Sequence, residues 1–248
     1  MHRFYIPPPD WNPRTLLLTG SEAHHCRNVL RLQPGDKAVL FNGRGAEITA
    51  EVSSTDGREV TLCKLHESRT PPLACRITLG QAIPKGKNMD LIVQKGVEIG
   101  ASEIVPIISD RTIVRLSEEE TAQKQAKWQT IAIEAAKQCG QNWLPDVQTP
   151  QTLSQFFSNG PRFDLQLIGS LQSDALHFKN ILADYARAQE RPPASVLMLI
   201  GPEGDFTPAE LNLARSHGCR PISLGPIILR VETAAIYCLS VLSYELLG

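Results

Sequence analysis

The 248-residue sequence lacks several features that would place it in a specialised class. Its six cysteines are scattered and form no C-x-x-C pair, so we expect neither a metal site nor a disulfide framework, and reduced cytoplasmic thiols are the simplest interpretation. The N-terminal segment MHRFYIPPPD has no apolar region typical of a signal peptide. The most apolar stretch, residues 227–248, is interrupted by Arg230, Glu232 and Glu245 and is too polar to span a bilayer.

The sequence also lacks an excess of basic charge. Its net charge of −1 gives no global signal for nucleic acid, although a local basic patch remains compatible with this value. No glycine loop carries the Lys-Ser/Thr of a P-loop or matches G-x-G-x-x-G, which argues against an enzyme that holds a phosphate-bearing nucleotide. What is present is an apolar fraction of 42%, enough for the core of one large domain or two ordinary ones.

Residues 1–70 have the pattern of a small β domain. Alternating strands are expected at 3–6, 37–41, 46–52 and 59–66, with turns at 33–36 and 42–45 and a helix over 21–32. A small barrel of this size is a common scaffold for binding oligonucleotides. Residues 67–73, ESRTPPL, contain two consecutive prolines and are expected to be a stiff linker.

From residue 74 to residue 248 strands and helices alternate. Strands are expected at 76–82, 103–108, 164–169, 196–201 and 221–224, and helices at 88–100, 118–138, 174–188, 208 onward and 234–247. This order predicts an α/β domain with a parallel sheet covered on both faces. The last apolar helix is compatible with core burial, with a subunit interface, or with both on different faces.

Two glycine loops end neighbouring strands in the C-terminal part of the chain. The run 196–200 stops at Gly201-Pro202-Glu203-Gly204, and the run 221–224 stops at Gly225-Pro226. In open parallel sheets ligands bind beyond the carboxyl ends of strands, so the two loops suggest one small-molecule pocket. Thr207, Pro208 and Glu210 predict a capped helix after the first loop. The alternative is that both loops are ordinary turns.

Basic residues form two candidate RNA-contacting groups. On the expected helix 21–32, His24, Arg27 and Arg31 are spaced i, i+3, i+7 and would share one face. This N-terminal group comprises His24, His25, Arg27 and Arg31, with Arg3 and Arg44 nearby. In the second domain Lys85, Lys87, Arg111 and Arg115 follow strands and Lys95 interrupts a helix, and of these Lys85, Lys95 and Arg111 are the candidates for RNA contact. The alternative for both groups is a solvated charged surface.

The segments IGPEGDFTPAE and SLGPIILRVETAA resemble the C-terminal signature of the SPOUT RNA methyltransferases. Within them the chain is most similar to the RsmE family, which methylates N3 of a uridine in 16S ribosomal RNA. HHCRNVLRLQPGD, QKGVEIGASEIVPIISDRT and AIEAAKQCGQNWLPDV also resemble this family, so the likeness spans nearly the whole chain. It implies a PUA-like β-barrel, a parallel sheet with a C-terminal trefoil knot, bound S-adenosylmethionine, and a homodimer acting on the small ribosomal subunit.

The resemblance also implies which residues hold the cofactor. Backbone groups of the two glycine loops would surround it, and glycines there would allow close approach. The expected cofactor-binding residues are Leu171, Ile200, Gly201, Pro202, Gly204, Ser223, Leu224, Gly225, Ile228, Leu229, Arg230 and Thr233.

Methylation of uridine N3 sets its own chemical demands. The N3–H is weakly acidic, and its loss puts negative charge on the base, so a proton acceptor, a stabilising cation or both are needed. Arg230 is the candidate cation, with an ion pair to Glu232 or Glu203 as the alternative. Either glutamate is a candidate base, or it holds Arg230. The competing functions are a non-catalytic RNA-binding protein of this fold and a SPOUT methyltransferase acting on another RNA nucleotide.

Overall fold

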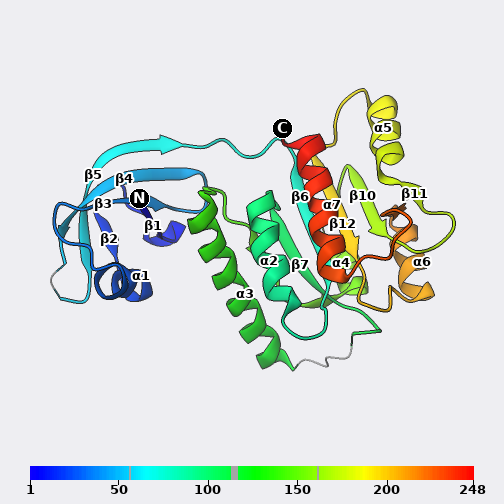
Figure 1. Ribbon diagram of the computed structural model, residues 1–248, viewed down its shortest axis with the longest axis horizontal. Helices are drawn as coiled ribbons and strands as arrows, with labels where there is room; N and C mark the ends of the chain where they lie inside the picture. Colours follow the sequence, from blue (N-terminus) through cyan, green and yellow to red (C-terminus); the bar gives the residue numbers. More distant parts are fainter. Residues whose placement is uncertain (56, 113–116, 161) are drawn as a thin grey trace. The chain divides into compact units, whose positions relative to one another are not determined.

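The chain divides into two compact units in a computed structural model that describes residues 1–55, 57–112, 117–160 and 162–248 (Figure 1). The first unit contains residues 1–72 and 133–144, and the second contains 73–132 and 145–248. The sequence suggested a single boundary near residues 70–74, with the long helix wholly in the second part. In the structure the end of that helix belongs to the first unit. Arg115 lies outside the described residues.

The first unit is a curled five-stranded sheet. Its strands are β1 (His2–Tyr5), β2 (Leu16–Leu18), β3 (Lys37–Phe41), β4 (Ala46–Ser54) and β5 (Val60–Arg69). They lie in the order β1-β3-β4-β5-β2, with β1 parallel to β3 and the other pairs antiparallel. A 3-10 turn, η1 (Pro8–Asp10), follows β1. The predicted hairpins are confirmed, whereas the short strand β2 was not predicted.

The prediction of an α-helix over residues 21–32 is wrong for its second half. Helix α1 (Gly20–His24) continues into a π-helical turn, η2 (His25–Val29), in which the amide of Leu30 donates to the carbonyl of His25 over 2.9 Å. A π turn holds more residues than an α turn, so i, i+3, i+7 positions no longer stack. Arg31 lies beyond the helix with φ 55°. His24, Arg27 and Arg31 therefore do not share one helical face.

The second unit is an eight-stranded sheet whose pairings are all parallel, as predicted. Its strands are β6 (Arg76–Ala82), β7 (Glu103–Ile108), β8 (Asp146–Val147), β9 (Gln151–Thr152), β10 (Leu165–Gly169), β11 (Leu176–His177), β12 (Ser195–Ile200) and β13 (Arg220–Ser223). The order is β11-β13-β10-β12-β6-β7-β8, with β9 also on β7. β8, β9 and β11 were not predicted, because two residues carry no periodic pattern.

Six helices complete the described part of this fold. They are α2 (Asn88–Ile99), α3 (Glu118–Cys139), α4 (Leu153–Asn159), α5 (Phe178–Gln189), α6 (Pro208–Ser216) and α7 (Val231–Leu246). α2 and α7 pack together over one face of the sheet, on the side of β6 and β12. α4 and α6 cover the other face, where Phe156 and Leu211 join a buried apolar cluster. Helix α4 was not predicted, and α5 begins later than expected because β11 occupies residues 176–177.

The sheet order brings three strand ends together. β10 lies between β12 and β13, and β12 lies between β10 and β6, so the loops that follow these parallel strands share one edge. Residues 224–230 lead from β13 to α7 at this edge.

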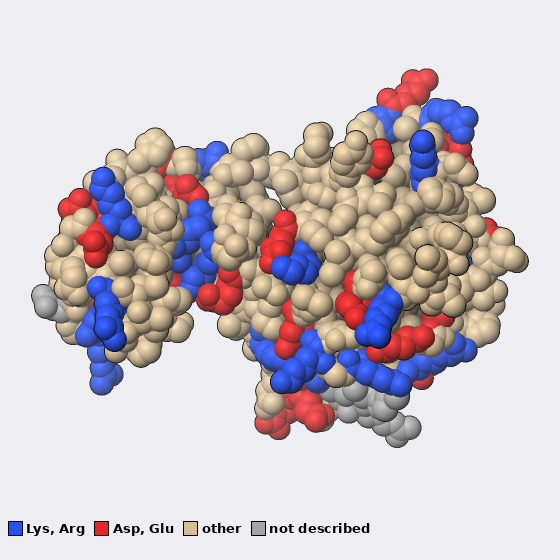
Figure 2. Space-filling model, viewed as in Figure 1, with Lys and Arg blue, Asp and Glu red and all other residues tan. Residues whose placement is uncertain are grey.

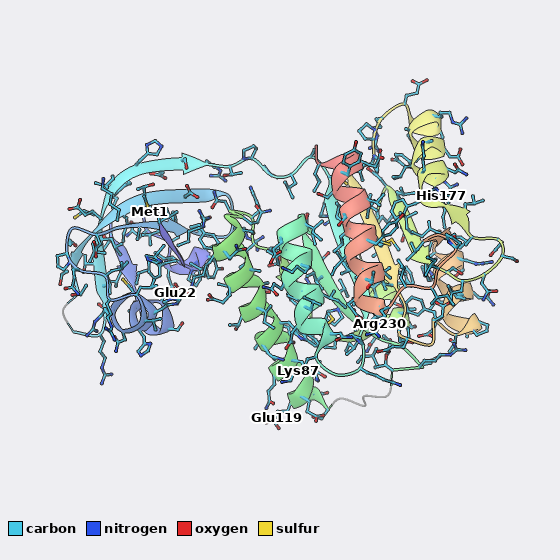
Figure 3. All side chains as sticks on the ribbon, viewed as in Figure 1. Met1, Glu22, Lys87, Glu119, His177 and Arg230 are labelled. Atoms are coloured by element: carbon cyan, nitrogen blue, oxygen red, sulfur yellow. The ribbon has the colours of Figure 1, made fainter. Side chains whose placement is uncertain are left out.

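Lys and Arg side chains gather along the lower edge of the second unit as viewed in Figure 2. Lys87 lies in the turn before α2 and Arg230 at the start of α7 (Figure 3).

Candidate functional site

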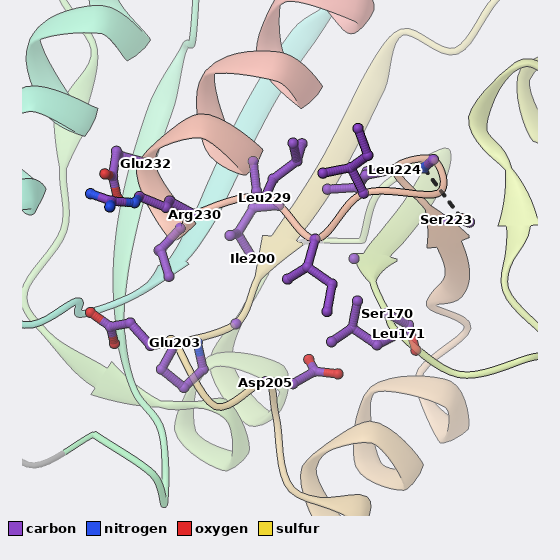
Figure 4. Close-up of a pocket in the computed structure, with 18 of the residues that line it drawn as sticks. Ser170, Leu171, Ile200, Glu203, Asp205, Ser223, Leu224, Leu229, Arg230 and Glu232 are labelled. Atoms are coloured by element: carbon purple, nitrogen blue, oxygen red, sulfur yellow. Dashed lines mark hydrogen bonds between the residues drawn. The ribbon is translucent and has the colours of Figure 1, made fainter.

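A pocket of about 730 Å³ lies at the carboxyl ends of β10, β12 and β13. Its walls come from the three loops after these strands and from the first turn of α7, and Asn88 at the start of α2 completes them (Figure 4). The lining residues are Asn88, Gly169–Gln172, Ile200–Glu203, Asp205, Ser223–Glu232 and Ala234. The two glycine loops that the sequence indicated therefore meet in one cavity.

All the expected cofactor-binding residues line this pocket except Gly204 and Thr233. The carbonyl of Gly204 accepts a hydrogen bond from the Arg111 guanidinium, and a Cβ at Gly204 would lie 3.4 Å from Cδ of Arg111. Gly204 therefore does not line the pocket, although its neighbours Glu203 and Asp205 do. Thr233 is exposed on α7, whereas Glu232 and Ala234 line the pocket.

Gly201 and Gly225 are needed for different structural reasons. Gly225 has φ 112°, a left-handed conformation that L-residues rarely adopt, and open space lies where a side chain would begin. At Gly201 an added Cβ would lie 3.1 Å from the amide nitrogen of Phe206, inside the loop. Gly225 therefore sets the backbone path along the pocket, and Gly201 allows the first loop to close on itself.

One end of the pocket is strongly polar. Figure 4 shows Glu203, Arg230 and Glu232 together on the side away from Ser223 and Leu171. The carboxylate of Glu203 accepts a hydrogen bond from the backbone amide of Lys85 (2.9 Å).

The carboxylate of Glu232 in turn accepts a hydrogen bond from the side-chain amide of Asn88, over 3.1 Å. Among the residues that the structure describes, the side chain of Arg230 makes no hydrogen bond and no ion pair. The structure therefore does not contain the alternative arrangement, in which Arg230 forms an ion pair with Glu232 or Glu203.

The other end is more apolar and more open. Leu171, Ile227 and Ile228 line it with 65%, 74% and 75% of their surfaces exposed. Asp205 also faces this end, with a left-handed backbone (φ 62°) and a carboxylate oxygen that accepts the amide of Phe206 over 2.8 Å. Asn88, Ser170, Gln172 and Asp205 were missed by the sequence reasoning, and Asp205 was the easiest to find because it directly follows Gly204.

A buried glutamate fixes the exit of the first glycine loop. Glu210, 7% exposed, completes the predicted capping box with Thr207, which the structure confirms. Its carboxylate accepts the amide of Thr207 over 2.8 Å and that of Asp110 over 3.0 Å. The same side chain therefore caps α6 and joins it to the loop after β7.

The candidate RNA-contacting residues of the first unit differ in their availability. Arg3 has a side chain only 14% exposed and donates to Glu47 and to Asn142, each over 2.6 Å. It stabilises the unit and is not placed to meet a phosphate. Arg27 donates to the carbonyl of Gly57, and His25 is half-buried with its ring edge-on to Phe4. His24 and Arg31 are exposed.

The candidate RNA-contacting residues of the second unit also differ in their availability. Lys95 pairs with Glu98 over 2.8 Å, one helical turn away on α2. Arg111 is exposed but donates to the Gly204 carbonyl, so it is tied to the first glycine loop. Lys85 and Lys87 are exposed in the turn between β6 and α2, next to the polar end of the pocket.

Cys219 and Cys238 are buried. Burial raises the pKa of the Cys219 thiol to about 12 and also raises that of Cys238, so neither is a thiolate nucleophile. Within the described ranges, no group of three or more His, Cys, Asp or Glu side chains is arranged to hold a metal ion. No helix in these ranges is both long and apolar enough to cross a bilayer.

Comparison with known proteins places this chain in a family. The model of an RNA methyltransferase domain matches residues 71–243, and that of an RNA methyltransferase PUA domain matches residues 18–62. The ribosomal RNA small subunit methyltransferase E of Bacillus subtilis is 31% identical over 238 residues, which cover 93% of this chain and 90% of that protein. The chain belongs to the ribosomal RNA small subunit methyltransferase E family. The resemblance that the sequence motifs indicated is thereby confirmed.

Solved structures agree with membership in the methyltransferase E family. The Neisseria gonorrhoeae member, crystallised with S-adenosylmethionine, superimposes with a TM-score of 0.85 at 32% identity and covers 99% of this chain and 98% of its own. A methyltransferase from Legionella pneumophila with bound S-adenosylmethionine gives a TM-score of 0.85 at 34% identity, covering 98% and 97%. The likeness extends over both units of the chain.

Proposed function

We propose that this protein uses S-adenosylmethionine to methylate N3 of a uridine in the 16S ribosomal RNA of the small subunit. The observation that carries the proposal is the meeting of both glycine loops in one pocket with Arg230, whose side chain has no partner among the described residues. The family relatives, which are named for methylation of small-subunit ribosomal RNA, support the substrate class. The choice of uridine N3 rests on the likeness of the signature segments to the RsmE family.

The pocket fits the proposed cofactor in size and charge. Its volume of about 730 Å³ is within the roughly 300–1,000 Å³ typical of small-molecule sites. Glu203, Asp205 and Glu232 outnumber Arg230 among its ionisable groups, so its net negative charge suits a ligand that carries a sulfonium. Leu171, Ile200 and the loop 223–229 would hold the cofactor, whose sulfonium supplies an electrophilic methyl group.

The polar end of the pocket supplies the groups that the target base needs. The Arg230 guanidinium, unpaired among the described residues, would stabilise the negative charge that develops on the uracil oxygens as N3 loses its proton. The Glu232 carboxylate, half-buried beside it, would accept that proton. Glu203 is exposed and holds the Lys85 amide, which gives it a supporting role in the loop.

RNA would be held by both units. The first unit, which matches a PUA domain model, would act as a PUA-like barrel presenting His24 and Arg31, and the second would offer Lys85 and Lys87 near the pocket. Exchanging the arginines Arg27 and Arg31 for alanine is expected to weaken RNA binding and to flatten its salt dependence while sparing cofactor affinity. An unchanged salt slope in titrations at several ionic strengths would remove this surface from the interface.

Two features of the family enter as proposals for this chain. The segment 224–230, which connects β13 to α7 along the edge of the sheet, would close a trefoil knot. The protein would act as a cytoplasmic homodimer, with the exposed Tyr237 and Tyr244 of α7 at the interface. A monomer by light scattering at micromolar concentration would contradict the dimer.

Transfer of tritium from labelled S-adenosylmethionine tests the function directly. The acceptor is the small ribosomal subunit from a strain that lacks the enzyme, and nucleoside mass spectrometry identifies the product. We expect 3-methyluridine. Another methylated nucleoside would keep the enzyme class and change the target. Cofactor binding without any label would show that the substrate is wrong, and absence of both would favour a non-catalytic RNA-binding protein.

Exchange of single carboxylates then assigns the proton acceptor. The variant Glu232→Gln is expected to lose at least tenfold in kcat, as is typical when a general base is removed, whereas Glu203→Gln should lose much less. Equal losses in both variants would show that neither carboxylate alone accepts the proton.

A further inference from the structure

Asn88 is the one residue of α2 that lines the pocket. It begins the helix directly after the turn that follows β6, and it is half-buried. Its side-chain Nδ2 donates to Oε2 of Glu232 over 3.1 Å, across 144 positions of sequence. The contact thus joins the first turns of two helices, α2 and α7, at the polar end of the pocket.

The chemical character of this contact decides its effect. Asn88 is a neutral donor, so it orients the Glu232 carboxylate without cancelling its charge. Arg230, two residues earlier and lining the same pocket, would be the natural ion-pair partner of Glu232 but makes no such pair among the described residues. Glu232 also lies in the first turn of α7, where the helix dipole favours a negative charge.

The turn between β6 and α2 holds the second carboxylate of the pocket, that of Glu203. The backbone amide of Lys85 donates to Oε1 of Glu203. Lys85 lies three residues before Asn88, which donates to Glu232. The turn between β6 and α2 and the first residue of α2 therefore contact the two glutamates that line the pocket with Arg230. The Lys85 contact is made by the backbone and survives side-chain exchange, which leaves Asn88 as the contact that a substitution can remove.

We propose that Asn88 is a positioning residue, which holds the Glu232 carboxylate apart from Arg230 so that both charged groups stay available to the substrate. The proposal rests on the proposed function. Without the Asn88 amide, Glu232 would turn to Arg230, and the ion pair would occupy the cation and the proton acceptor together.

Two substitutions separate positioning from folding. Asn88→Ala removes the donor, and Asn88→Asp keeps the shape but sets a second carboxylate against Glu232. The matched control is Asn180→Asp, because Asn180 is exposed in the first turn of α5 and does not line the pocket. Each variant is assayed for kcat and KM with small ribosomal subunits, for cofactor affinity by calorimetry, and for thermal unfolding without ligand.

We expect Asn88→Ala to lower kcat by about tenfold or more, because misplacement of a reacting group is costly. Cofactor affinity and the unfolding temperature should stay near those of the wild type. In Asn88→Asp the two adjacent carboxylates cannot easily both ionise, so the acid limb of the pH profile of kcat should move to higher pH. The control variant should match the wild type in every assay.

The other charged groups of the pocket and of the turn before α2 bear on this profile. They are Arg230 at the start of the same helix, Glu203 and Asp205 from the loop after β12, and Lys85 and Lys87 from the turn before α2. All are unchanged in the variants, so a shift seen only in Asn88→Asp belongs to the new carboxylate.

The outcomes distinguish the inference from the function on which it rests. If the wild type transfers no methyl group, the proposed function fails and the inference falls with it. If the wild type is active and the Asn88 variants keep its kcat and pH profile, only the inference is overturned. Parallel losses of kcat, cofactor affinity and unfolding temperature would assign Asn88 a structural role and would also overturn it.

Discussion

Arg230 and Glu232 are two residues apart, yet their surroundings differ. Arg230 is the N-cap residue of α7, where a structural arginine gains nothing from the helix dipole, and its guanidinium has no partner among the described residues. Glu232 is in the first turn of the same helix and accepts a hydrogen bond from Asn88. An unpaired cation beside a fixed carboxylate is suited to a reaction in which a proton leaves and negative charge develops.

Exchange of Arg230 tests whether its charge acts on the substrate or on the cofactor. We expect Arg230→Ala to lower kcat by about 10²–10³-fold, the usual cost of losing one group that stabilises a developing anion, with a small change in cofactor affinity. Arg230→Lys, which keeps the charge but not the planar fork, should recover part of the loss. Single-turnover rates and calorimetry measure the two effects. A loss of cofactor affinity that accounts for the whole loss of rate would make Arg230 a cofactor-binding residue.

Gly225, in the second glycine loop, and Gly218, outside the pocket, can be compared to test whether that loop contacts the cofactor. Both have left-handed backbones, with φ 112° and 88°, and a Cβ would meet no atom closer than 3.5 Å at either. Alanine at each should therefore cost a similar conformational strain, roughly 1–2 kcal/mol in the free energy of unfolding. Only Gly225 lines the pocket, so only Gly225→Ala should also weaken cofactor binding in a titration. Equal affinities in the two variants would show that the second loop does not contact the cofactor.

Helices α4 and α6 begin with the same local device in different surroundings. Thr152 with Gln155, and Thr207 with Glu210, both form complete capping boxes. Among the described residues the Gln155 side chain bonds only within its own capping box, to Thr152, whereas Glu210 also binds the amide of Asp110 in the loop after β7. The first glycine loop is therefore held at its exit by a contact that reaches the loop after β7.

The two capping boxes predict different costs. Glu210→Ala should lower the free energy of unfolding by about 1–3 kcal/mol beyond the loss in Gln155→Ala, because it also leaves the amide of Asp110 without an acceptor. Urea denaturation of both variants measures the difference. Equal losses would mean that the contact to Asp110 adds nothing to the stability of the fold.

At the scale of the whole molecule, α3 contributes to both compact units. Its residues from 133 onward belong to the first unit, where Lys137, with a side chain 8% exposed, pairs with Glu22 over 3.0 Å. Burial raises the pKa of Glu22, while Lys137 opposes that rise. The ion pair therefore anchors the end of the helix within the first unit.

Removal of Lys137 should destabilise the protein in a pH-dependent way. Lys137→Met leaves Glu22 buried without its cation, and we expect a loss of roughly 2–3 kcal/mol near neutral pH. A carboxyl whose pKa is raised by folding favours the folded state when protonated, so the loss should shrink as the pH falls toward 4.5, the ordinary value for glutamate. Denaturation near both pH values measures this. A loss that is the same at both would show that Glu22 does not carry the effect.

Local chemistry made much of the fold predictable. The runs 37–41, 76–82 and 103–108 are the strands β3, β6 and β7 with the expected bounds. Gly100 ends α2 in a left-handed conformation, and Thr207 caps α6 through Glu210 as expected. Each of these features depends on residues within one turn or one strand. The π turn at His25–Val29 and the internal ion pair of Arg3 depend on neighbours elsewhere in the first unit and were not predictable.

The sequence by itself determined the two glycine loops, the adjacent Arg230 and Glu232, and the family, because each is written in consecutive residues. Only the tertiary structure decided that Asn88 meets Glu232 and that the Lys85 amide meets Glu203, across 144 and 118 positions. It also decided that Gly204 turns away toward Arg111. Such contacts follow from the packing of α2 on α7 and from the order of the parallel strands, which bring distant segments to one edge and which no local pattern encodes.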